Sequence, residues 1–372
     1  MTMKILIVSN DYFNNSNGMC ISTQRFVTEF ERMGYEVRVC TNNRYGESYY
    51  PLGVLNVPVF AGIIEKEGYT FAKTDRKVLR KAIEWADIVH IEDGFPLCAA
   101  AAKMANKLRK PCTGTYHLFP ENMTYAAGFG WCRPLTWAIY RYFRATYDRC
   151  SAVQCPTETV KERLLYMGHH SELSVISNGI AENGTETIRT EKPEKYCGKF
   201  LILTVGRLSE EKNQAELIKA VGLSKYSNKI QLIIAGKGPL EGKLRQLGSS
   251  LHNTPIISFY TREELSEIES YADLYVHCAT VEIEGMSAME AFAAGVVPVI
   301  ADAELSGTKC YALDMRSLYR TGSAEDLAEK IDYWIEHLTE LDDMRSMYIS
   351  LGKSLSLTIS SGKLAQMLCQ DL

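Results

Sequence analysis

Two cations in the second half of the chain follow an apolar run and could bind a diphosphate. Arg207 and Lys212 lie in the segment VGRLSEEKN, after the run LILTV and beside a helix that we expect to begin near Glu211. A guanidinium offers a planar fork of donors and an ammonium a point charge, and phosphate oxygens accept hydrogen bonds from both. A solvated turn that contains two cations by chance would look the same, so this pair alone leaves both interpretations open.

Two glutamates stand at a spacing suited to sugar hydroxyls. Glu282 and Glu290 flank Gly285 in VEIEGMSAMEAFAAGVVPVIAD, where the glycine permits a turn and residues 286–294 predict a helix. The N-terminus of a helix presents unpaired N–H groups that can hold a phosphate. Glu290, about one turn into the helix, could accept two ribose hydroxyls, and Glu282 could reach those of a bound sugar. We interpret Glu284 as an exposed partner of the helix dipole.

Short apolar runs alternate with helical periods along the whole chain, which predicts an α/β fold with parallel sheets. A helix over residues 23–33 should end at Gly34, a left-handed cap. The polar stretch after residue 177 interrupts the pattern, so two doubly wound, Rossmann-like domains should face each other across a cleft. The expected strands are 4–8, 36–40, 87–91, 112–116, 152–155 and 174–176, then 199–205, 230–235, 274–278 and 297–300.

Composition excludes several classes of protein. The 372 residues are 46% hydrophobic and 23% charged, typical of a globular protein, and no apolar run is long enough to span a membrane. Eleven scattered cysteines without a CxxC pair indicate neither a disulfide framework nor a zinc site, and no secretory signal is evident. These features predict a cytoplasmic protein. A pI near 6.1 and the lack of a recognised motif argue against nucleic-acid binding.

Taken together, the C-terminal motifs resemble those of the retaining glycosyltransferases of the GT-B fold, family four. The resemblance rests on the cation pair, the two glutamates some seventy residues later, and the segments IIAGKGPLEGKL and YADLYVHCA. It implies that Arg207 and Lys212 contact the donor diphosphate, that Glu290 binds the nucleotide ribose, and that Glu282 contacts the hexose. The backbone around Gly285, Met286 and Ser287 would meet the phosphate and the sugar. Ile283 and Glu284 replace the glycine and the aromatic residue common in the family.

The resemblance extends more weakly into the first half. SNDYFNNSNGMC resembles the family's glycine loop near the donor phosphates, with Gly18 as the residue of close approach. His117, in TGTYHLFPEN, matches a histidine near the donor sugar, although an isolated histidine is more often structural. Glu92 and Asp93 could border an acceptor pocket. The predicted division is residues 1–180, a linker at 181–198, residues 199–355, and a C-terminal helix at 356–372 that crosses back to the first domain.

The segment RPLTWAIYRYFRATYDR, residues 133–149, interleaves arginines with aromatic residues. Such a stretch suits a membrane interface, where arginine and aromatic side chains can both snorkel. An ordinary helix packed on the sheet would have the same sequence pattern. Several lipid-directed members of the family have a basic, aromatic N-domain of this kind. We therefore expect Trp137, Arg141 and Arg144 on an acceptor or membrane side, and a peripheral enzyme on the inner face of the cell membrane.

The resemblance implies a retaining hexosyltransferase that uses a nucleoside diphosphate sugar, UDP-glucose or UDP-galactose, and a lipid acceptor such as diacylglycerol. We expect no cofactor and no metal, because the chain has no Asp-x-Asp at a strand end and Asp342–Asp343 reads as solvated helix. The alternatives are a GDP-mannose-dependent enzyme, a soluble or polysaccharide acceptor, a nucleotide-sugar epimerase of the same fold, and a silent sugar-nucleotide binding module.

Overall fold

The structure is a computed structural model that describes residues 2–14, 17–42, 46–56, 69–130, 132–181 and 189–370. The chain forms two compact units. Unit 1 comprises Met1–Ala181 together with Leu357–Leu372, and unit 2 comprises Glu182–Ser356. Part of the expected linker, residues 182–188, lies outside the described residues.

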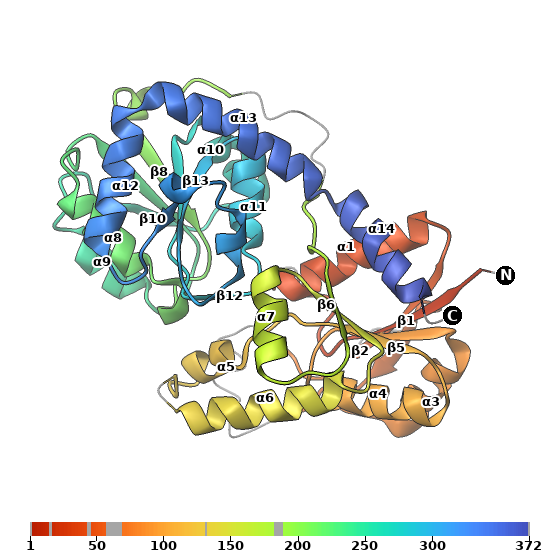
Figure 1. The fold of residues 1–372 in the computed structure, drawn as a ribbon. Helices are drawn as coiled ribbons and strands as arrows, with labels where there is room; N and C mark the ends of the chain where they lie inside the picture. Colours follow the sequence, from red (N-terminus) through yellow and green to blue (C-terminus); the bar gives the residue numbers. More distant parts are fainter. Residues whose placement is uncertain are drawn as a thin grey trace. The chain divides into compact units, whose positions relative to one another are not determined.

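Unit 1 contains a parallel seven-stranded sheet in the order β3-β2-β1-β4-β5-β6-β7 (Figure 1). The central strands are buried along nearly their whole length because helices cover both faces of the sheet. The order reverses between β1 and β4, so the loops after these two strands leave in opposite directions. The bounds are β1 Lys4–Val8, β2 Glu36–Asn42, β3 Tyr49–Leu52, β4 Ile88–Ile91, β5 Cys112–Thr115, β6 Ala152–Cys155 and β7 Glu172–Val175.

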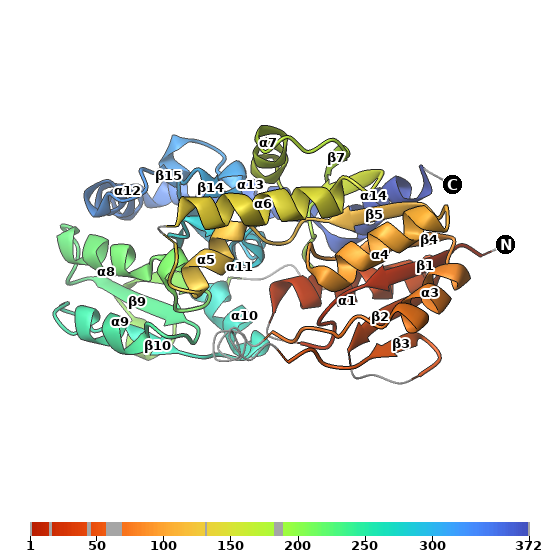
Figure 2. The same ribbon diagram turned by 90° about the horizontal axis from the view of Figure 1, so that it is seen from below.

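The helices of unit 1 lie on both faces of its sheet, with α1 and α14 on one face and α3, α4 and α6 on the other (Figures 1 and 2). Helix α1 begins after Asn17, whose side chain accepts a hydrogen bond from the Met19 amide at 3.0 Å. It ends at Gly34 with a φ of +89°, which confirms the expected cap. The bounds are α1 Gly18–Arg32, α3 Arg76–Trp85, α4 Pro96–Lys107, α5 Pro120–Ala126, α6 Arg133–Tyr147, α7 Glu158–Tyr166 and α14 Leu357–Cys369.

The last helix, α14, belongs to unit 1 although unit 2 precedes it in the chain. The Leu357 amide donates to the Ile180 carbonyl at 2.8 Å, so the chain re-enters unit 1 beside the point where it left. Leu364 and Leu368 are buried in the same core cluster as Phe26 and Phe30 of α1. The return of the C-terminus to unit 1 therefore rests on apolar packing.

Unit 2 repeats the architecture with a parallel six-stranded sheet in the order β10-β9-β8-β11-β13-β15. Helix α8 packs against α12, and α11 packs against α13. The sheet order reverses between β8 and β11. The strands are β8 Phe200–Val205, β9 Ile230–Ala235, β10 Ile256–Ser258, β11 Leu274–His277, β13 Val297–Ala301 and β15 Leu318–Tyr319, with β12 Val281–Glu282 paired to β14 Leu305–Ser306. The helices are α8 Gln214–Leu223, α9 Glu241–Gly248, α10 Arg262–Tyr271, α11 Met286–Ala293, α12 Ala324–Glu336 and α13 Leu338–Ser354.

Candidate active site

The predicted donor residues of unit 2 gather where its sheet order reverses. Arg207 and Lys212 lie in the loop after β8, and Glu282 lies in β12, just after β11. Strands β8 and β11 are hydrogen-bonded neighbours, so their carboxyl ends lie side by side. Ligands of open α/β sheets bind at such a switch point, because the diverging loops leave a crevice between them.

Lys212 and Glu282 form an ion pair across this point, between Nζ and Oε2. The buried His277 lies behind them, with Nε2 3.6 Å from the same carboxylate oxygen. Burial opposes the charge of Glu282, but the Lys212 ammonium and the neighbouring His277 ring outweigh it and lower the pKa to about 2. Glu282 is therefore a carboxylate at any physiological pH.

The loop that carries the two cations is braced by the loop after β9. A Cβ added at Gly236 would lie 1.9 Å from the Gly206 carbonyl oxygen, and one at Gly238 would lie 2.3 Å from that of Leu208. The Leu208 amide also donates to the Lys237 carbonyl at 3.0 Å. Only glycines allow this close approach, so the segment of residues 236–238 fixes the path of the chain around Arg207.

The N-terminus of α11 forms the next part of the site. Gly285 precedes the helix with a φ of +81°, and a Cβ there would lie 2.3 Å from the Thr308 hydroxyl oxygen. The hydroxyls of Ser287 and Tyr275 each lie within hydrogen-bond distance of the Val205 carbonyl, at 3.1 and 3.2 Å. The first turn, which includes Met286, is thus fastened to the end of β8, and the unpaired N–H groups of a helix N-terminus can bind an anion.

Glu290 lies in α11 and is accompanied by two ionisable residues of α10. Arg262 approaches its carboxylate at 3.7 Å. Glu269 is the second neighbour: burial first, and the charge of Glu290 second, raise the pKa of Glu269 to about 8. Glu269 thus carries a proton at neutral pH, which spares Glu290 a second negative charge beside it.

The expectation for Glu284 was wrong. Its side chain is buried rather than exposed, and its carboxylate accepts a hydrogen bond from the Tyr311 hydroxyl at 2.7 Å. Tyr311 follows 27 residues later, in the 3₁₀ segment Gly307–Tyr311, and no local spacing links the two. Glu284 therefore anchors the loop before α11 instead of facing solvent.

Unit 1 has its own switch point, between β1 and β4, and several predicted residues lie there. The Asn10 side-chain amide donates to both Asp93 carboxylate oxygens, at 3.0 and 2.9 Å, and so ties together the loops after these strands. Burial raises the pKa of Asp93. Gly18 opens α1, and a Cβ there would meet open space, so packing does not demand a glycine at this position.

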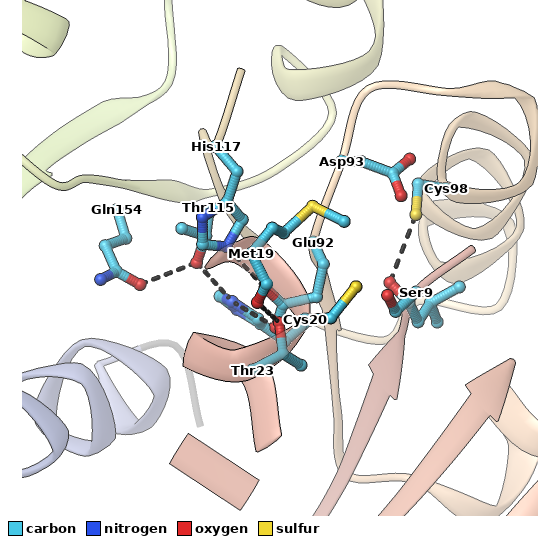
Figure 3. Close-up of polar contacts among 12 residues, drawn as sticks. Ser9, Met19, Cys20, Thr23, Glu92, Asp93, Cys98, Thr115, His117 and Gln154 are labelled. Atoms are coloured by element: carbon cyan, nitrogen blue, oxygen red, sulfur yellow. Dashed lines mark hydrogen bonds and ion pairs between the residues drawn. The ribbon is translucent and has the colours of Figure 1, made fainter. Parts of the chain in front are cut away.

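His117 and Glu92 form a buried hydrogen-bonded pair at the carboxyl ends of β5 and β4 (Figure 3). The distance between His117 Nε2 and Glu92 Oε2 is 2.8 Å. Both side chains are only 4% exposed. Asp93 and His117 line a crevice of about 10 Å³, roughly the space of one water molecule.

Trp137, Arg141 and Arg144 share the outer face of α6. With Tyr166 and Met167 they line a groove of about 560 Å³. The Arg141 guanidinium stacks on the Trp137 ring at 4.9 Å, and 54% of Trp137 is exposed. Tyr140, Phe143 and Tyr147 occupy an adjacent face of the helix and are buried. The helix is therefore both a packed core helix and the carrier of an aromatic, basic surface.

Four further residues of these two sites were missed by the sequence reasoning. Tyr275 and His277 lie on β11 and point polar groups at the site of unit 2. In unit 1, His90 lies on β4, two residues before Glu92, and Thr23 of α1 adjoins the Glu92 carboxylate. A polar residue within an otherwise apolar, buried run is the sequence signal that could have revealed His90 in VHIE and His277 in YVHC.

Comparison with known proteins decides the family of this chain. Residues 16–183 match the family described as Glycosyltransferase Family 4, and residues 186–350 match that described as Glycosyl transferases group 1. The chain belongs to the family-four glycosyltransferases of the GT-B fold.

Similar proteins include alpha-monoglucosyldiacylglycerol synthases of two bacteria. That of Streptococcus pneumoniae is 28% identical over 329 residues, which cover 80% of this glycosyltransferase and 71% of the relative. That of Acholeplasma laidlawii is 23% identical over 320 residues, or 80% of each chain. The fold matches the crystal structure of Anabaena Alr3699/HepE in complex with UDP-glucose, with a TM-score of 0.75 and 17% identity over 98% of this chain and 99% of the other.

In the described residues, no group of three or more His, Cys, Asp or Glu side chains is placed to hold a metal ion. Over the same residues, no helix combines the length and apolar character needed to cross a bilayer.

Proposed function

We propose that this glycosyltransferase transfers glucose or galactose from the corresponding UDP-sugar to a membrane lipid, diacylglycerol or a related long-chain acceptor, and retains the anomeric configuration. The observation that carries the proposal is the Lys212–Glu282 ion pair at the switch point of unit 2, beside the N-terminus of α11. In this proposal Lys212 is the cation for a diphosphate, and Glu282 beside it is the carboxylate for sugar hydroxyls.

The chemistry follows from these charges. Departure of the nucleoside diphosphate develops negative charge, which Arg207, Lys212 and the α11 N–H groups are suited to stabilise. Glu282 stays ionised beside Lys212 and accepts hydrogen bonds from the hexose, while Glu290 accepts them from the ribose. The leaving diphosphate takes the proton of the acceptor hydroxyl on the same face of the sugar, so the configuration is retained. In this scheme the protein's own cations supply the electrostatic stabilisation, and the reaction proceeds without a metal.

Two observations support a lipid acceptor. The relatives from Streptococcus and Acholeplasma are named for glucosylating diacylglycerol. In addition, large apolar side chains are exposed on and around α6, next to Arg141 and Arg144. Aromatic and basic side chains together suit the interface of an anionic membrane. The exposed residues are Tyr125, Phe129, Leu135, Trp137, Tyr142, Leu165 and Tyr166.

A donor–acceptor matrix tests the proposal. The purified protein is incubated with UDP-glucose, UDP-galactose or GDP-mannose, each with diacylglycerol in anionic vesicles, with soluble glycans, or without acceptor. We expect a glycolipid from a UDP-hexose, unchanged yield in EDTA, and a small anomeric ¹H coupling constant that identifies the α-anomer.

Each alternative gives a different product in the same matrix. Transfer only from GDP-mannose or only to a soluble glycan would replace the proposed substrates, and an epimerised donor without acceptor would indicate an epimerase. A β-linked product would overturn the retaining mechanism. Absence of turnover with every donor, despite nucleotide binding, would indicate a silent binding module.

A further inference from the structure

Glu92 joins two segments of unit 1 that the sequence placed near the donor. It follows β4 directly, and its amide continues the ladder by donating to the Val8 carbonyl at 3.1 Å. Its carboxylate accepts a hydrogen bond from His117, two residues beyond β5. Thr23 of α1 adjoins the carboxylate, and its hydroxyl donates to the Met19 carbonyl at 2.9 Å, in the first turn of that helix (Figure 3).

Glu92 is charged although it is buried. Burial opposes the charge, but the hydrogen bond from His117 and the polar groups around the carboxylate outweigh it, so that the pKa of Glu92 is lowered. A carboxylate has no proton to donate, so the 2.8 Å contact requires a proton on His117 Nε2. Nδ1 is then the nitrogen left for a ligand.

A second layer of side chains determines the hydrogen bonds of His90, the buried histidine next to Glu92. Gln154 Nε2 donates to the Ile176 carbonyl at 2.9 Å, so its Oε1 is the acceptor for the Thr115 hydroxyl at 2.7 Å. Because this bond uses the single hydroxyl proton of Thr115, the Thr115 oxygen must accept a hydrogen bond from His90 Nε2 at 2.8 Å. His90 Nδ1 then accepts from the Thr113 hydroxyl, also at 2.8 Å.

This chain of hydrogen bonds assigns the state of His90. Burial lowers the pKa of His90, so the ring is neutral, with its proton on Nε2. That nitrogen lies 3.7 Å from Glu92 Oε1, and the N–H dipole supports the carboxylate without adding a charge. Hydrogen bonds thus run in one direction from Thr113 through His90, Thr115 and Gln154 to the Ile176 carbonyl, and Figure 3 shows the step from Thr115 to Gln154.

From this geometry we propose that Glu92 is a positioning residue, which holds His117 as the Nε2–H tautomer and leaves Nδ1 as the hydrogen-bonding atom for a ligand at the switch point of unit 1. The inference rests on the proposed function only for the identity of that ligand. The sequence had suggested that Glu92 borders an acceptor pocket. Its burial and its hydrogen bond with His117 instead place it behind that residue, where it acts through the imidazole.

Nitrogen-15 NMR of histidine-labelled, ligand-free protein tests the tautomer directly. The chain has seven histidines, and a His117→Gln variant assigns the signals of interest. We expect wild-type His117 to show a protonated Nε2 and an unprotonated Nδ1 at pH 8, and Glu92→Gln to lose that fixed state. Glu121→Gln is the matched control, because Glu121 is a partly buried carboxylate bonded to Tyr140 and Arg163 and not to a histidine. It should leave the His117 signals unchanged.

Kinetics separate positioning from a merely structural role. Glu92→Gln should lower kcat on the order of a hundredfold, as displacement of an oriented group does, with little change in KM and with a shifted pH–rate profile. Glu92→Asp should restore part of kcat because it keeps the charge. A protonated Nδ1 in the wild type, or Glu92→Gln with unchanged NMR signals and kcat, would overturn the proposal. Because the NMR experiment needs no substrate, its result stands even if the donor or the acceptor proves to be different.

Discussion

The side chains of Lys212 and Glu282, seventy residues apart in the chain, meet in an ion pair between the carboxyl ends of β8 and β11. Neither is free in solvent, since 22% of the lysine side chain and 17% of the glutamate side chain are exposed. The pair fixes both groups before any ligand arrives, which is the preorganisation that electrostatic catalysis requires. A bound diphosphate would share Lys212 with Glu282 rather than recruit it from water.

Removing either member of this pair should abolish turnover without unfolding the protein. We expect Lys212→Ala and Glu282→Ala each to lower the rate by at least about a hundredfold, the usual cost of losing one charged transition-state contact. Steady-state assays check the rate, and circular dichroism checks the fold. Lys225→Ala, which removes an exposed lysine of the same unit, is the control. Near-normal activity in either variant would refute the site assignment.

The ion pair should also make the stability of unit 2 depend on pH. The pKa of Glu282 falls from its ordinary value of 4.5 to about 2, so the pair stabilises the fold above pH 4.5 and loses this contribution as the pH falls through 2. Lys212→Met should therefore lower the melting temperature at pH 7, by an amount that shrinks between pH 4.5 and 2. Thermal melts over this range measure it. A difference independent of pH would show that the pair is not the cause.

Glu269 should have the opposite pH dependence. Its pKa is raised from 4.5 to about 8, so its contribution to stability is full below pH 4.5 and is lost as the pH rises through 8. Glu269→Gln, which mimics the protonated form, should melt like the wild type at pH 4 and a few degrees higher at pH 9. Scanning calorimetry at the two pH values checks the prediction. Destabilisation by the same amount at both values would contradict it.

Gly236→Ala should disturb the loop of Arg207. The added methyl would lie 1.9 Å from the Gly206 carbonyl oxygen, so the backbone must move. We expect a drop of several degrees in melting temperature and weaker nucleotide binding. Gly242→Ala is the matched control, because its methyl would meet open space on α9 and alanine favours a helix. Equal melting of the two variants would show that the close approach does not matter.

The outer face of α6 should bind anionic membranes. Each cation near such a surface contributes about 1 kcal/mol, so Arg141→Ala with Arg144→Ala should lower the partition coefficient by roughly thirtyfold. Co-sedimentation with phosphatidylglycerol vesicles at low salt measures this. The control removes two exposed cations of unit 2, Lys225 and Lys243. Equal binding by both double variants, or none by the wild type, would contradict a membrane role for α6.

The sequence predicted the sheets well because their strands are buried on both faces. Lys4–Val8, Ala152–Cys155 and Ile230–Ala235 have the expected bounds, since a continuous apolar run between turns leaves little freedom. Tyr49–Leu52 and Ile256–Ser258 were missed. The first contains a proline and two tyrosines, and the second has three residues. Both are edge strands, where the apolar signal is weakest.

The sequence predicted which residues form the site better than it predicted the contacts between their side chains. The positions of Lys212 and Glu282 follow from strand order and loop spacing, but their direct pairing does not. The helix expected near Glu211 begins at Gln214, after one 3₁₀ turn, because Asn213 adopts a left-handed conformation with a φ of +50°. The links from Glu284 to Tyr311 and from Glu92 to Thr23 join distant segments, which no local pattern encodes.

Isothermal titration with UDP and UDP-glucose tests most directly whether the switch point of unit 2 holds the donor. We predict that the wild type and Lys225→Ala bind with equal affinity, and that Lys212→Ala binds at least about tenfold more weakly, since an oriented charge contact to phosphate contributes more than 1.4 kcal/mol. Equal affinity in all three proteins, or no binding by the wild type, would contradict the account.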